Sequence, residues 1–328
     1  MLKGAVSAER HSTIDGLMNR SKFYARQYAL LLILLLLIAV LSYVSPSFLK
    51  LSNLMNIFRQ ISFVGIAAMG MTFVIISGAI DLSIGGIAAC TGVITSSLIK
   101  DFGLPIVPSI LGGLFIGLVL GGTNGVLISR FMVPPFMATI VMMNFARGVA
   151  YVYKEAQPIY DLPREFRSIA SGFVGPIPIL AIVMLLIFFA CHIVLKNTVF
   201  GRRIYATGGN ENAARYSGIR TSNITILIFA IMGLLAALTG ILLAARIGAG
   251  DPGSGAGLEL DAIAAVVMGG TSIGGGVGGV FGSLIGAVVI GVIDNALVLL
   301  NISPWYQPIV KALVILIAVL ADRKNKWK

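Results

Sequence analysis

Charged residues are scarce in this sequence. Asp, Glu, Lys and Arg make up 11% of its 328 residues, whereas a soluble globular domain carries close to a quarter. A chain with so few charges cannot cover a water-exposed surface of this size, so a soluble fold is excluded. Hydrophobic residues make up 57% of the chain, and the mean hydropathy is +0.97. We therefore expect a protein whose main solvent is lipid.

Residues that carry most enzyme and metal chemistry are also few, with two Cys and two His in the whole chain. Cys90 and Cys191 lie inside apolar runs, which is typical of small core residues rather than of a disulfide. Cys191 and His192 offer two neighbouring ligands without a carboxylate, so we expect no metal site. No nucleophile lies near a base outside the apolar segments, and the sequence does not indicate an enzyme.

The phosphate-binding pattern GxxxxGK[ST] is absent. If transport is driven by ATP, the ATPase must be another polypeptide, and we expect no cofactor in this chain. The net charge of +11 does not indicate nucleic acid, because the basic residues cluster in short loops, as membrane topology requires.

Long apolar segments are what the sequence has in abundance, most of them close to the 20 residues that cross a bilayer. We predict an all-α polytopic membrane protein with about ten transmembrane helices. The predicted spans are 28–48, 61–79, 83–99, 105–129, 135–153, 174–195, 222–246, 260–275, 278–300 and 305–321. The third and eighth are short and interrupted by glycine, which indicates broken or tilted helices. Residues 52–60 are predicted as an interfacial amphipathic segment.

The basic residues orient these spans. Fifteen of the 24 Lys and Arg residues lie in the segments that are cytoplasmic if the N-terminus is inside, as the positive-inside rule requires. Both termini are then cytoplasmic. The predicted organisation is an N-terminal tail (1–27), a transmembrane domain (28–322) with a cytoplasmic loop (196–222), and a C-terminal tail (323–328).

A weak internal similarity links the two halves. Residues 124–136 read NGVLISRFMVPPF, and residues 295–307 read NALVLLNISPWYQ. Each has an asparagine near a helix end, an aliphatic turn, and a proline that opens the next helix. Because these segments run in opposite directions in the predicted topology, the two halves are expected to be inverted five-helix repeats. Chance similarity between apolar segments is the alternative.

The loop 196–222 is the longest charged internal segment. Asn210 is a good N-cap, the residues up to Ser217 favour or tolerate a helix, and Gly218 is a stop signal. One interpretation is an ordinary loop that sets topology. A capped helix within it also predicts a rigid contact for a cytoplasmic partner.

Within that loop, TGGNENAARYSGI (207–219) resembles the cytoplasmic coupling segment of the ribose permease family, the sugar-type permeases of bacterial ABC importers. SGAIDLSIG (77–85), NGVLI (124–128) with PFMAT (135–139), and LELDAIAAVVMGGTSIGGG (258–276) resemble other segments of that family. The resemblance runs from about Leu54 to Asp322. The stretch YKEAQPIY (153–160) departs from the family pattern, which leaves the identity of the solute open.

The resemblance implies a permease of the bacterial cytoplasmic (inner) membrane. Two copies, a homodimer, would form the path for a pentose, a hexose or a related sugar. A cytoplasmic ATP-binding subunit would grip the coupling segment, and an extracytoplasmic solute-binding protein would deliver the sugar. The implied coupling residues are Gly209, Asn210, Glu211, Asn212, Ala213, Ala214, Ser217 and Gly218.

Polar residues inside the apolar segments form a second group of candidates, because such residues are costly in lipid and often functional. Asp81 and Asp261 are predicted at helix breaks, where a carboxylate is stabilised by the positive end of a helix dipole. The candidates for the substrate path are Asn124, Asn144, Asp294 and Asn295. Hydrogen bonds between helices are the alternative role for these side chains.

Other functions remain open at this stage. A related ABC permease could carry a nucleoside or a branched-chain amino acid. An ion-coupled secondary transporter would need protonatable or sodium-binding groups in its spans, for which Asp81, Asp261 and Asp294 are available. A purely structural scaffold is disfavoured by the many helices that glycine interrupts.

Overall fold

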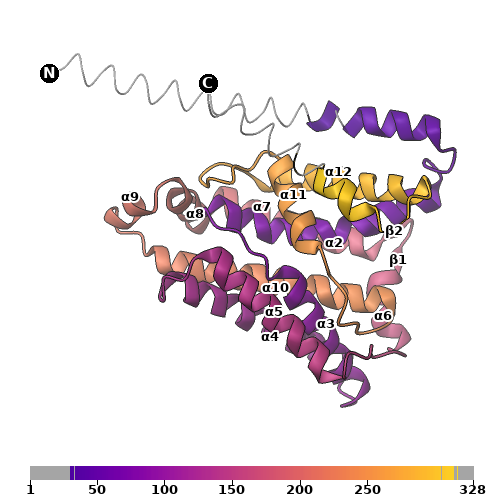
Figure 1. Cartoon of the computed structure of the whole chain (residues 1–328), viewed down its shortest axis with the longest axis horizontal. Helices are drawn as coiled ribbons and strands as arrows, with labels where there is room; N and C mark the ends of the chain where they lie inside the picture. Colours follow the sequence, from indigo (N-terminus) through magenta and orange to yellow (C-terminus); the bar gives the residue numbers. More distant parts are fainter. Residues whose placement is uncertain (1–29, 33, 304, 314–315, 317–328) are drawn as a thin grey trace.

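Long helices packed side by side form most of the structure (Figure 1). The computed structural model describes residues 30–32, 34–303, 305–313 and 316, so the predicted tails 1–27 and 323–328 lie outside the described residues. The elements are α2 (Leu51–Ile76), α3 (Ile84–Lys100), α4 (Ile106–Ser129), α5 (Pro135–Tyr153), α6 (Arg164–Ser171), β1 (Phe173–Val174), β2 (Ile177–Pro178), α7 (Ile179–Asn197), α8 (Val199–Gly209), α9 (Glu211–Tyr216), α10 (Thr221–Ile247), α11 (Leu258–Met268) and α12 (Val280–Leu299).

Six of the described helices are long and apolar enough to cross a membrane, namely α2, α4, α5, α7, α10 and α12. Two shorter apolar helices are α3 and Leu30–Val44. This content fits the predicted polytopic membrane protein. The tenth predicted span, 305–321, falls partly outside the described residues, and its residues 307–313 are helical.

The segment predicted as interfacial at 52–60 is the first part of α2, which is continuous from Leu51 to Ile76. One polar residue of its first turn, Asn53, binds another helix. The amides of Asn53 and Asn295 exchange two hydrogen bonds of 2.8 and 3.0 Å. An interhelical amide pair accounts for the polar side chain at position 53.

The all-α prediction fails at one short hairpin. Residues 173–174 and 177–178 pair antiparallel, and the sixth span therefore begins at Ile179 instead of residue 174. Pro176 and Pro178 have no backbone N–H to donate, so neither residue can lie in the helix beyond its first turn. Gly175 has φ +60°, a conformation that side chains disfavour.

Two further helices, α6 and α8, were not predicted. Each carries several polar and charged side chains, and each buries a narrow apolar stripe, for example Phe166 and Ala170 in α6. A search of the sequence for apolar segments of about 20 residues does not find such short amphipathic helices. The eighth predicted span, 260–275, is the short helix α11 followed by a glycine-rich loop, 269–279.

The core surrounds α2, whose most apolar 18-residue window is 83% buried. Helices α7, α10, α11 and α12 all pack against it. Small residues in its centre, including Gly65, Ala67, Ala68 and Gly70, let these neighbours approach closely. One consequence is that α2 holds together elements from both halves of the chain.

Candidate functional site

The charged loop folds into two helices, α8 and α9, at one end of the long helices (Figure 1). The Thr198 hydroxyl accepts a hydrogen bond of 3.1 Å from the Gly201 amide and caps α8. The Asn210 side chain accepts one of 3.0 Å from the Ala213 amide and caps α9. Both bonds satisfy first-turn amides that have no partner within the helix. The short helix predicted after Asn210 is confirmed.

The surface of α9 is open to a partner. Asn210, Glu211, Asn212, Ala213, Ser217 and Gly218 are exposed, whereas Ala214 is buried beneath them. The sequence interpretation missed Tyr216, whose side chain is 90% exposed on this surface. An exposed aromatic residue on an otherwise polar tip was the available signal, since Tyr is enriched among energetically important contact residues.

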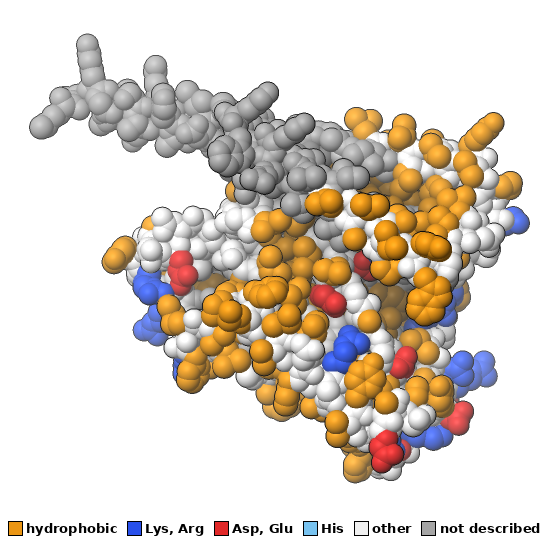
Figure 2. Space-filling model, in the orientation of Figure 1, with side chains coloured by type: hydrophobic (Ala, Val, Ile, Leu, Met, Phe, Trp, Pro, Cys, Tyr) orange, Lys and Arg blue, Asp and Glu red, His pale blue; other side chains and the backbone are white. Residues whose placement is uncertain are grey.

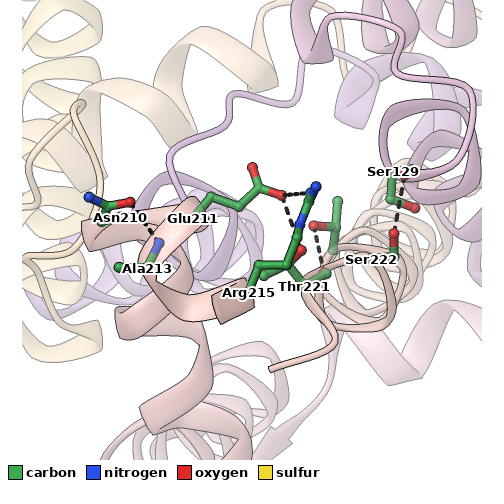
Figure 3. A network of polar contacts seen from close by, with 8 residues as sticks. Ser129, Asn210, Glu211, Ala213, Arg215, Thr221 and Ser222 are labelled. Atoms are coloured by element: carbon green, nitrogen blue, oxygen red, sulfur yellow. Dashed lines mark hydrogen bonds and ion pairs between the residues drawn. The ribbon is translucent and has the colours of Figure 1, made fainter. Parts of the chain in front are cut away.

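Polar contacts tie α9 to the helix that follows it (Figure 3). The Glu211 carboxylate pairs with Arg215 at 3.0 Å and accepts a hydrogen bond of 3.1 Å from the Thr221 hydroxyl, in the first turn of α10. The Ser222 hydroxyl donates to the Ser129 carbonyl at the end of α4. These contacts connect the exposed tip to two long helices.

Asp81 lies in the break between α2 and α3 and is fully buried. Its Oδ1 accepts hydrogen bonds from the Ser83 amide (2.7 Å) and the Ser83 hydroxyl (2.6 Å). The Asn124 amide of α4 donates to the same hydroxyl at 2.9 Å. Asn124 is itself buried and joins α4 to the start of α3 in this structure.

Two other candidates for the substrate path, Asp294 and Asn295, also contact side chains of neighbouring segments. The Lys311 ammonium donates a hydrogen bond of 2.9 Å to Asp261 in α11. It also lies 3.0 Å from Asp294 in α12, as an ion pair without hydrogen-bond geometry. Next to Asp294, Asn295 is paired with Asn53. The Lys311–Asp261–Asp294 triad fastens the helical residues 307–313 to α11 and α12.

Asn144 is the path candidate that faces open space. It lies on an open groove of about 430 Å³ along α5, with Phe145, Gly148, Val149, Val152 and Tyr153. One turn further, Arg147 approaches Gly85 at the start of α3, and Glu259 at the start of α11 meets the same glycine. Figure 2 shows acidic and basic side chains in the middle of a largely hydrophobic face. Arg147 and Glu259 were not among the predicted site residues.

Among the described residues no group of three or more His, Cys, Asp or Glu side chains is placed to hold a metal ion. Cys90 and Cys191 are both buried and unpaired with each other. The described part of the chain thus offers contacts between helices and an exposed helix tip at α9.

The opposite end of the molecule carries α6 and the hairpin (Figure 1). There the Asp101 carboxylate accepts a hydrogen bond of 2.8 Å from the Ser97 hydroxyl and pairs with Lys154 at 3.1 Å. The Ser97 hydrogen bond and the Lys154 charge lower the pKa of the Asp101 carboxyl below its ordinary value. Asp101 remains ionised at neutral pH and links the end of α3 to the end of α5.

Comparisons with known proteins agree on one family. The family model described as branched-chain amino acid transport system / permease component matches residues 53–319. The ribose import permease protein RbsC of Haemophilus influenzae is 46% identical over 293 residues, covering 88% of this chain and 90% of that protein. RbsC of Escherichia coli K12 is 41% identical over 318 residues, covering 96% and 99%.

A third relative is named for another sugar. The L-arabinose ABC transporter permease protein AraH of Azospirillum brasilense is 34% identical over 312 residues, covering 94% of this chain and 89% of that protein. No solved structure matches the chain.

Proposed function

The chain belongs to the family of branched-chain amino acid transport system permease components, and from this premise we propose that it is the membrane-spanning subunit of a bacterial ABC importer for a sugar. The observation that carries the proposal is the identity of 41–46% to ribose import permeases over about nine-tenths or more of the chain. The absence of a phosphate-binding loop in the sequence agrees with a subunit that is driven by a separate ATPase.

The solute is a pentose or a related sugar. The relatives named for ribose and arabinose align with nearly the whole chain. The family description names branched-chain amino acids, and that solute class is the second candidate. An amino acid zwitterion requires charged or helix-end groups. Arg147 of α5 and Glu259 of α11 both lie near Gly85 at the start of α3, and this is the observation that favours such a solute.

The proposed topology has ten crossings with both termini in the cytoplasm. The placement of α8–α9 and α6 at opposite ends of the long helices supports it (Figure 1), because the basic loop 196–222 is assigned to the cytoplasm and α6 to the outside. The proposed inverted repeats place Asn124 near the end of α4 and Asn295 near the end of α12, and both residues hold neighbouring helices.

Three partners follow from this arrangement. The cytoplasmic ATP-binding subunit, which carries ATP and Mg, docks on the exposed tip of α9, with Tyr216 as its aromatic contact. The solute-binding protein docks at the end that carries α6. A second copy of the chain completes the path, since the groove beside Asn144 is open on one protomer.

Reconstituted transport tests this proposal. The chain, its partner ATPase and its solute-binding protein are placed in proteoliposomes, and uptake of labelled ribose, arabinose and leucine is measured. We expect ribose or arabinose uptake that requires ATP and both partners. Leucine uptake alone would retain the ATP-driven mechanism and replace the solute class. Uptake that persists without ATP under an ion gradient would refute the importer and favour an ion-coupled transporter.

A further inference from the structure

One glycine of α8 lies against two other segments without any side chain between them. A methyl group at Gly208 would collide with the carbonyl oxygen of Ile76 and would lie 2.9 Å from the Gly276 amide nitrogen. Ile76 is the last residue of α2, and Gly276 belongs to the loop 269–279 between α11 and α12. Three segments that are distant in sequence therefore meet, backbone to backbone, at Gly208.

Hydrogen bonds hold this contact together. The Gly276 amide donates to the Ile76 carbonyl at 2.8 Å, so Gly208 packs directly over the bond that joins the loop to α2. The Tyr205 hydroxyl of α8 donates to the Gly278 carbonyl at 2.8 Å. Burial raises the pKa of the Tyr205 phenol to about 12, so it remains protonated, and a donor, throughout the physiological pH range.

The loop is shaped to fit α8. Gly275 and Gly276 have φ +79° and +72°, a region that side chains rarely adopt. A methyl group at Gly275 would lie 2.5 Å from the Gly208 carbonyl oxygen and 3.0 Å from the Gly78 Cα. Larger residues at either side of the contact would force the loop away from α8 and α2.

The same helix leads directly to the docking tip. Only Asn210 separates the end of α8 from the start of α9, and its side chain caps α9. Because a connection of one residue allows the two helices little independent movement, a displacement of α9 moves α8 with it. The end of α2 and the loop before α12 are then the backbone segments that α8 displaces first.

We propose that Gly208, with Tyr205, forms a transmission joint that passes movement of α9 to the end of α2 and to the α11–α12 loop. This inference rests on the proposed function, since it assumes that an ATPase acts on α9. Gly208 lies within the segment 207–219 that resembles the coupling segment but is not among the implied coupling residues, which begin at Gly209, and the proposal gives it a positioning role of its own.

Neighbouring glycines show that the close packing is particular to this position. A methyl group at Gly209 or at Gly218 would meet no atom within 4 Å. The packing at Gly208 is therefore not a general property of the segment. A purely structural role for Gly208 would alter stability, whereas a transmission role also alters the amount of sugar moved for each ATP hydrolysed.

The test uses the complete importer in proteoliposomes and measures ATP hydrolysis, labelled ribose uptake and thermal stability together. Gly208→Ala is compared with Ala206→Ser, which adds one atom on the exposed side of the same helix. In Gly208→Ala we expect ATP hydrolysis to continue while uptake per ATP falls roughly 5- to 150-fold, the usual range of coupling between two sites. Ala206→Ser is expected to match the unsubstituted chain.

A second variant decides the case if Gly208→Ala fails to fold. Tyr205→Phe keeps the ring and removes only the donor to Gly278, and we expect uptake per ATP to fall roughly two- to tenfold with the loss of one hydrogen bond. An unchanged ratio of uptake to hydrolysis in a folded variant would overturn the joint and leave the importer intact. If the unsubstituted chain shows no ATP-driven uptake, the proposed function itself fails.

Discussion

At the scale of single residues, several buried polar side chains in the described part of the chain bind one another. Asp81 is held by Ser83, Asn295 by Asn53, and Lys311 by two aspartates. The Asn295 and Lys311 groups join segments that are far apart in sequence, and the Ser83 hydroxyl that binds Asp81 also accepts a hydrogen bond from Asn124 of α4. Burying a charge is tolerable in a membrane protein only with such partners. These residues therefore mark positions at which helices contact one another.

Replacing Lys311 with Met leaves the Asp261 and Asp294 carboxylates without their common cation. Because the Lys311 side chain is 21% exposed, we expect a loss of about 2–4 kcal/mol, at or below the range for fully buried pairs. Thermal unfolding in detergent measures the change. Lys311→Arg, which keeps the charge, serves as the control, and equal stability of the Met variant and the unsubstituted chain would contradict the prediction.

The ion pair between Asp101 and Lys154 predicts that the stability of the folded chain depends on pH. The pKa of Asp101 is lower in the folded protein than its ordinary value, so its contribution to stability is present above the unfolded pKa, about 3.9, and is lost as the pH falls through the folded value. We expect Asp101→Asn to destabilise the protein by no more than about 1 kcal/mol at pH 7.

The check is a series of unfolding measurements from pH 7 to the lowest pH at which the chain remains soluble in detergent. The difference between the Asn variant and the unsubstituted chain should shrink as the pH falls below about 4. A difference that stays constant through that range would show that the Asp101 charge contributes nothing.

At the scale of elements, glycine determines which helices approach most closely. A methyl group at Gly121 of α4 would collide with the Phe229 carbonyl and lie 2.8 Å from the Gly233 Cα of α10. A methyl group at Gly122, one residue on, would meet only the Ala230 side chain at 3.9 Å. The α4–α10 crossing thus depends on one face of α4.

We expect Gly121→Ala to destabilise the chain by about 1–3 kcal/mol through overpacking. Gly122→Ala is the matched control and should be neutral or slightly stabilising, because Ala has the higher helix propensity. Thermal unfolding of both variants in the same detergent provides the comparison. Equal effects of the two substitutions would mean that this crossing is looser than the structure shows.

Much of the element level was predictable from sequence. Apolar length located α4, α5, α7, α10 and α12 to within a few residues, and cap chemistry at Asn210 located α9. Patterning could not show that residues 52–60 extend α2, because the polar side chain of Asn53 pairs with Asn295 across more than 200 positions of sequence. Nor could it separate Gly208 from Gly209, since only the packing distinguishes them.

At the scale of the whole molecule, each of the two ends of the helices exposes a tyrosine. Tyr216 is 90% exposed at the end with α9, and Tyr160 is 62% exposed in the loop before α6, at the other end. Both native cysteines are buried, so single cysteines introduced at these sites can be labelled against a low background.

In intact cells a membrane-impermeant thiol reagent should label Tyr160→Cys from outside and leave Tyr216→Cys unmodified until the membrane is opened. This pattern follows from the topology proposed from the basic loops. Labelling of Tyr216→Cys in intact cells would reverse the orientation. Labelling of both sites from outside would instead require a different number of crossings.

The burial of α2 also has a consequence for biosynthesis. The helix is complete at Ile76, but α12, one of its covering helices, ends only at Leu299. At 5–20 residues per second, roughly 220 further residues take about 10–45 s to synthesise. Until α12 is made, the face of α2 that α12 covers is open to lipid or the insertion machinery. A nascent chain that stops before α12 leaves that face of α2 uncovered, so the truncated protein differs from the finished one in the apolar surface it exposes.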